Sequence, residues 1–175
     1  PKITGIETHG FQIWINHADK ERLVQPKSMH ASSNEIPEKI TEDYKLRIVH
    51  GEWEGLKPNY QMVTAVNLFH LFLKPNKSIR LSAMPMAFVY GLQGQGKTED
   101  ELIQAQSLVN YSLKGDQVIV HALDEGFEFM FACGTPHNES ITYGGPFVMT
   151  TAEQMAETKR RYAKGDMGKL DPYSG

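Results

Sequence analysis

The sequence predicts an all-β sandwich or barrel that is preceded by a strand-bearing arm and followed by one C-terminal α-helix. Short apolar runs alternate with turn residues at roughly ten-residue spacing along most of the chain. Only the region after residue 150 carries both a helix start signal and a helix stop signal. At 175 residues, the chain is long enough to bury one substantial core.

The strands are expected where aromatic and β-branched residues cluster or alternate with polar ones. In chain order these segments are 11–16, 44–50, 62–73, 79–90 with a break at Pro85, 102–113, 117–123 and 128–133. Residues 17–43 are polar and are expected to form a connection. Tight turns are predicted at Pro75-Asn76, Lys114–Asp116 and Asp124–Gly126, because these residues favour turn backbone conformations.

The C-terminal helix is expected to start at a capping box formed by Thr150 and Glu153. Basic residues gather in its last turns, which suits the helix dipole, and Gly165 can end it in a left-handed conformation. A thin stripe at helical spacing would face the rest of the protein: Ala152, Met155, Ala156, Lys159 and Tyr162.

Composition indicates a protein of a reducing compartment, and we expect the cytoplasm. The net charge of −3 gives no general attraction to nucleic acid or to anionic membranes. The single cysteine, Cys133, excludes an intrachain disulfide framework. No apolar run approaches the ~20 residues that cross a bilayer, and no signal-peptide pattern opens the chain.

Two phrases of the sequence resemble those of the pirin family. The first, GGPFVMTTAEQMAETKRRYAKGDMG at 144–168, is similar to the C-terminal signature of that family. The second, HGFQIWIN at 9–16, is similar to a G-x-Q-x-W phrase that ends in Asn, and Pro26 and the Glu35–Pro37 triplet follow it as they do in pirins. The phrases are in the right order and span nearly the whole chain.

The resemblance implies a piece of a protein built from two cupin barrels of the jelly-roll type. Residues 1–40 would be the end of the first cupin and a linker arm, 41–150 the C-terminal cupin barrel, and 151–175 the helix and tail. Pirins bind iron through a His-x-His and a later His-x-Glu pair, both upstream of these phrases. The chain contains no His-x-His pair, so iron is expected in an N-terminal cupin that lies outside it.

We therefore expect a metal-free cupin domain with a structural or protein-interaction role, and we assign no catalytic, cofactor-binding or metal-binding residues. The family resemblance implies an alternative, a dioxygenase of the quercetin 2,3-dioxygenase type, as an activity of the complete protein. Animal pirins are nuclear transcription cofactors, so the nucleus is a further location if the source is eukaryotic. Segment 1–16 and the helix stripe would otherwise pack on the first barrel. We expect them to drive self-association or strand exchange, or to bind a protein partner.

A phosphate-loop motif favours a different function. Gly91–Thr98 reads GLQGQGKT and satisfies G-x-x-x-x-G-K-T, in which Lys97 and Thr98 would contact phosphate and magnesium. Only 77 residues follow Thr98, too few for several strand–helix crossovers of ~30 residues each. Three carboxylates at 99–101 would also repel a polyphosphate. The preferred interpretation is a glycine-rich hairpin end, and the nucleotide binder stays as the less favoured alternative.

The remaining polar and aromatic residues suggest structural roles. Alternation predicts that His70 and His121 are buried, neutral histidines, although distant histidines could still assemble a metal site in an enzyme complete in itself. Cys133 lies in an apolar strand and is expected to be an inert, buried thiol. Four aromatic residues could line a pocket for a flat ligand, although core packing is their usual role: Phe11, Trp14, Trp53 and Tyr60.

Overall fold

The computed structural model describes residues 10–25, 27–99, 101–111 and 114–168. His9, Pro26, Asp100 and the ends of segments 1–16 and 102–113 lie outside these ranges. The described elements are η1 (Asp19–Glu21), β1 (Glu38–Ile40), β2 (Tyr44–His50), β3 (Val66–Leu73), β4 (Ser78–Ser82), β5 (Met86–Lys97), β6 (Leu102–Gln104), β7 (Leu108–Asn110), β8 (Gln117–Gly134), β9 (Thr142–Gly144), β10 (Phe147–Met149) and α1 (Ala152–Lys164). None of the described helices is long and apolar enough to span a membrane.

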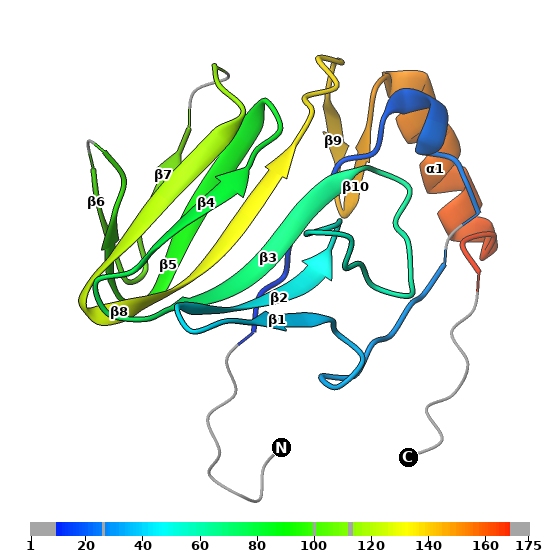
Figure 1. Ribbon diagram of the computed structural model, residues 1–175. Coiled ribbons are helices and arrows are strands. Elements are labelled where there is room, and N and C mark those ends of the chain that lie inside the picture. The colour runs from blue at the N-terminus through cyan, green and yellow to red at the C-terminus, as the bar shows by residue number, and fades with distance from the viewer. Residues whose placement is uncertain (1–9, 26, 100, 112–113, 169–175) are drawn as a thin grey trace, which may run out of the picture.

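Eight strands form one antiparallel sheet that curls into a barrel-like body (Figure 1). The main order is β1-β2-β3-β8-β5-β6, with β4 paired to β8 and β7 paired to β5. The long strand β8 holds the sheet together, because its first half pairs with β4 and its second half lies between β3 and β5. This architecture confirms the predicted fold class, a cupin-like β fold with one C-terminal helix.

The core lies inside the curled sheet and is apolar. Alternate residues of each strand point inward, as the burial of β2 and β4 shows. Its largest fully buried members are Phe69, Phe129, Phe131, Leu46, Ile48, Leu71, Leu81, Ile103, Val89 and Val120. Two ring stacks lie in this core. Phe69 of β3 stacks on Phe131 of β8 at 5.9 Å between ring centroids, and Phe127 stacks on Phe129 within β8 at 4.9 Å.

The helix α1 packs on the hairpin formed by β9 and β10 (Figure 1). It begins one residue later than predicted, because Thr151 and Gln154 form the capping box. It ends at Gly165 as expected, with φ of 79°. The predicted contact stripe is partly wrong. Met155 is buried, but Tyr162 is 62% exposed, and Thr158 takes the second buried position.

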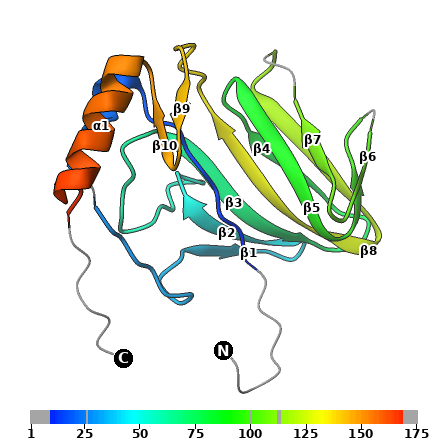
Figure 2. The same ribbon diagram turned by 180° about the vertical axis from the view of Figure 1, so that it is seen from behind.

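Three strand predictions need correction. Residues 11–16 form no strand; they cross the outside of the sheet and pack through side chains (Figure 2). The turn predicted at Asp124–Gly126 lies within β8, which continues through it with a left-handed Gly126 at φ 80°. Segment 102–113 is two short strands, because Gln106 adopts a turn conformation at φ 61°.

Candidate functional site

The described residues inside the barrel offer no donor set for a metal ion. The side chains that fill it are aliphatic or phenyl groups, together with the Cys133 thiol. Among the described residues, no group of three or more His, Cys, Asp and Glu side chains converges. Iron in proteins needs nitrogen, oxygen or thiolate ligands that meet at one point. The residues of this barrel therefore do not fit the iron that the resemblance implies for pirins.

The phosphate-loop motif is not a loop in the structure. Gly91–Lys97 belongs to β5 and pairs with β8 on one side and β6 on the other. Thr98 and Glu101 close the β5–β6 hairpin through a backbone hydrogen bond of 2.9 Å, so the turn lies just beyond the glycines. The segment is followed by β6, where a phosphate loop would require a helix.

The glycines of this motif serve close strand packing instead. A Cβ at Gly91 would lie 2.2 Å from the carbonyl oxygen of Gln104, and a Cβ at Gly96 would lie 2.4 Å from the ring of Phe127. Gly94 has a φ of 72° and its Cβ would meet the backbone of Gly126 at 2.2 Å. Because larger residues would collide with neighbouring strands, the G-x-x-G-x-G spacing here has a structural cause.

The described histidines do not gather at one site, and most of them are at least partly exposed. His70 contacts Glu128 at 2.8 Å, and His121 contacts the hydroxyl of Ser78 at 2.6 Å. Both rings are partly exposed on the outside of the sheet, so the prediction that they are buried is wrong. Among the described histidines, His50 is the buried one, at 6% exposed.

His50 ends β2 beside a hollow of mixed polarity, about 730 Å³ in volume, that Tyr60 also lines. The two rings stack at 6.5 Å between centroids, and Nδ1 of His50 is buried without a hydrogen-bond partner among the described residues. Burial lowers the pKa of His50, because the imidazolium form loses its hydration. Alternation along β2 places His50 on the same buried face as Leu46 and Ile48, so this pattern could have predicted its burial.

The N-terminal arm, residues 10–22, is fixed to the body at its C-terminal end. His17 Nδ1 lies 2.6 Å from Thr64 Oγ1, and the Arg22 guanidinium donates to the His17 carbonyl oxygen at 2.8 Å. Arg22 also pairs with Glu139 at 3.1 Å, and only 2% of the Arg22 side chain is exposed. The arm therefore has a defined path across the sheet.

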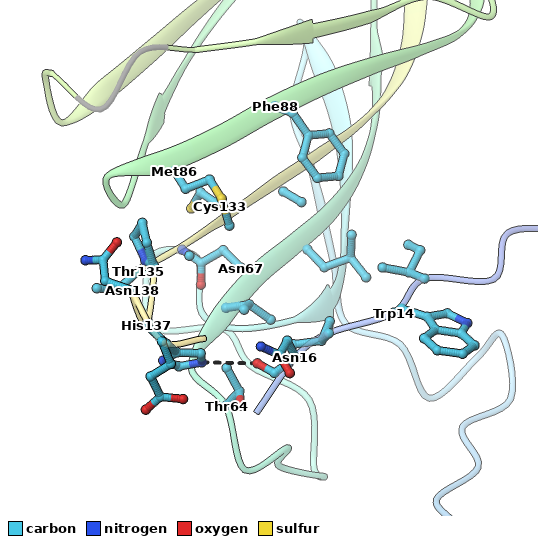
Figure 3. A pocket seen from close by; sticks show the side chains of 18 of the residues that line it. Trp14, Asn16, Thr64, Asn67, Met86, Phe88, Cys133, Thr135, His137 and Asn138 are labelled. Atoms are coloured by element: carbon cyan, nitrogen blue, oxygen red, sulfur yellow. Dashed lines mark hydrogen bonds between the residues drawn. The ribbon is translucent and has the colours of Figure 1, made fainter. Parts of the chain in front are cut away.

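A cavity of about 450 Å³ lies between this arm and the outer end of the sheet (Figure 3). Its walls come from arm residues 13–16, from β3, β5 and β8, and from segment 135–141. Most of the lining is apolar. Asn16, Thr64 and His137 stand together on one side in Figure 3, where Nε2 of His137 lies 3.1 Å from the Asn16 carbonyl oxygen.

The four aromatic residues suggested as one pocket are not brought together. Trp14 lines the arm cavity, and Phe11 packs edge-on against Tyr90 at 5.7 Å. Trp53 packs on Phe69 at the core, and Tyr60 lies at the His50 hollow. Cys133 is buried as predicted, and burial raises the pKa of its thiol.

Comparisons with known proteins agree with the fold. The model of the family described as the pirin C-terminal cupin domain matches residues 68–168. Pirin-like protein At1g50590 of Arabidopsis thaliana is 32% identical over 85% of this chain and 51% of its own length. Pirin of Homo sapiens is 26% identical over 85% of this chain and 53% of its own length.

A crystal structure of quercetin 2,3-dioxygenase from Acinetobacter baumannii superimposes with a TM-score of 0.78 and 22% identity, covering 90% of this chain and 56% of that chain. At this identity the likeness shows the fold alone. The chain thus spans about half the length of the curated relatives and of the solved structure that it matches.

Proposed function

Because this chain belongs to the pirin family and matches its C-terminal cupin domain, we propose that it is a metal-free structural barrel that supports an iron-binding N-terminal cupin. The observation that carries the proposal is the apolar filling of the barrel, because the described residues offer no set of metal donors inside the sheet. Residues 1–40 then form the crossing arm, 41–150 the barrel, and 151–175 the helix and tail.

The arm supplies a surface on which a second domain can dock. Phe11, Ile13 and Trp14 are 47%, 41% and 63% exposed, although they lie on a segment whose far end is firmly held. Exposed apolar side chains gathered on one segment are typical of an interaction surface. The relatives are about twice as long as the matched region. The rest of their sequence is long enough to form a second domain that covers this surface.

Mixing experiments test this docking. The N-terminal half of Pirin-like protein At1g50590, produced separately, is expected to bind the chain in sedimentation velocity. A Trp14→Ser variant is expected to bind at least tenfold more weakly. Tyr143→Ser serves as the matched control, because Tyr143 is an exposed aromatic residue on β9 (74% exposed). Equal binding by the Trp14 and Tyr143 variants would contradict the arm's role, and no binding by the unmodified chain would contradict the proposal.

In the absence of a partner domain, the same surface is expected to pair copies of this chain, by contact or by exchange of the arm. A sedimentation equilibrium experiment should show concentration-dependent association, and a monomer at all concentrations would refute it. The oxygenase chemistry named for the Acinetobacter protein would then belong to the complete protein. The chain alone is expected to consume no oxygen with a flavonol and saturating iron; turnover would favour an enzyme complete in itself.

A further inference from the structure

We propose that the arm cavity is a binding site for an uncharged aromatic alcohol, with the apolar body against the sheet and the hydroxyl at Asn16. The proposal does not depend on the supporting role argued above. It rests on the shape, polarity and charge of the cavity that lies between residues 13–16 and the outer face of β3, β5 and β8.

The size of the cavity suits a small organic molecule. Ligand pockets in proteins commonly measure roughly 300 to 1,000 Å³, with mostly apolar walls and a few polar groups. The arm cavity measures about 450 Å³. Leu68 and Phe88 form its apolar wall, and Trp14 stands at its edge with 63% of its surface exposed. A flat ring can therefore enter beside Trp14 and lie against the sheet.

Three polar groups gather on one side of the cavity, which Asn67, Thr135 and Asn138 also line. Figure 3 shows Asn16, Thr64 and His137 on the side opposite Phe88. Thr64 and His137 already bind His17 and the Asn16 carbonyl oxygen. The side-chain amide of Asn16 has no hydrogen bond to any described residue, so it can donate to and accept from one hydroxyl group.

Charge excludes the commonest alternative, an aromatic acid. No lysine or arginine is among the described residues that line the cavity. The one lining carboxylate, Glu139, is held by Arg22 at 3.1 Å, so that pair leaves no positive charge for a ligand. Moving a carboxylate from water into such a site without a cationic partner is costly. An uncharged alcohol meets no such penalty.

Isothermal titration calorimetry of the 175-residue chain tests this with 2-naphthol and 2-naphthoate as probes. We expect 2-naphthol to bind at one site and 2-naphthoate to bind at least tenfold more weakly. Ala132 lines the cavity from β8, so Ala132→Phe should fill it and weaken 2-naphthol at least tenfold. Ser82→Phe adds the same ring at an exposed site of β4 outside the cavity and should leave affinity unchanged.

Two further measurements locate the ligand. In Asn16→Leu, the preference for 2-naphthol over naphthalene should disappear, because only the hydroxyl contact is removed. When 2-naphthol is added to the unmodified chain, the changes in methyl chemical shift should be largest at Ile13 and Ile141, which both line the cavity. This measurement does not require the Ala132→Phe variant to fold. Absence of 2-naphthol binding, shifts elsewhere, or full affinity in a folded Ala132→Phe variant would overturn the proposal.

Discussion

Truncation of Phe131 to alanine tests whether the barrel interior is the packed, apolar core described above. Phe131 lies in the part of β8 that pairs with both β3 and β5, is 0% exposed, and stacks on Phe69 at 5.9 Å between ring centroids. Its neighbours on β3 and β5 are held by continuous strand pairing, so they cannot collapse into the space that the ring leaves. The variant therefore creates a cavity instead of relaxing around the loss.

The expected cost is about 3–5 kcal/mol in the free energy of unfolding, the range for Phe→Ala in well-packed cores. Total stabilities of domains are about 5–15 kcal/mol, so this loss would remove a large part of the total. The free energy of unfolding typically falls by about 2 kcal/mol per molar urea. A loss of about 4 kcal/mol would therefore lower the unfolding midpoint by about 2 M urea.

Urea unfolding followed by circular dichroism and tryptophan fluorescence measures the shift. Phe72→Ala is the matched control, because Phe72 is 37% exposed on the outer face of β3 and touches His70 at 4.5 Å between centroids. Its truncation should cost about 1 kcal/mol, within the range of partly exposed sites. If Phe131→Ala costs no more than Phe72→Ala, the interior is not the tight core on which the account depends.

Three other changes test particular parts of the structure. Gly91→Ala should lower the melting temperature, because its Cβ would lie 2.2 Å from a carbonyl oxygen of β6, while Gly10→Ala, with nothing within 4 Å, should not; equal melting temperatures would disprove the packing role. Lys97→Ala should leave ATP affinity, measured by calorimetry, unchanged, and a loss of measurable binding would restore the phosphate-loop hypothesis. Because the pKa of His50 is lowered in the folded chain, the unfolded chain binds a proton at His50 at a higher pH than the folded chain does. The contribution of His50 to the free energy of unfolding is therefore fully present above about pH 6.5, and it is lost as the pH falls from there toward the lowered pKa. Urea midpoints between pH 7 and ~5 should fall less steeply in His50→Gln than in the unmodified chain or in the exposed control His30→Gln, and identical slopes would refute this.

Sequence reasoning could predict the fold class and most strands, because alternation and turn residues are local signals. It placed the helix end at Gly165 correctly, since a left-handed glycine cap depends on one residue. It failed at 11–16, where aromatic and β-branched residues suggest a strand although no described strand pairs with them. Their apolar character reflects side-chain packing on the sheet, which alternation alone cannot distinguish from strand pairing.

Less of the candidate site could be predicted from the sequence. The arm cavity combines residues 13–16 with segment 135–141, and the contact depends on long-range bonds such as Arg22 to Glu139. The burial of His50 is an exception, because it follows the alternation of Leu46 and Ile48 along β2. The three motif glycines presented the opposite problem, because a strong local pattern suggested chemistry where only strand packing requires glycine.

Metal content gives the most direct test of the claim that this barrel works without a metal ion. The chain would be purified without chelators, incubated anaerobically with excess ferrous iron, desalted and analysed by inductively coupled plasma mass spectrometry. We expect far less than one metal ion per chain, because the interior offers no converging donors among the described residues. A stoichiometric ion of iron, nickel or manganese that survives desalting would contradict the account.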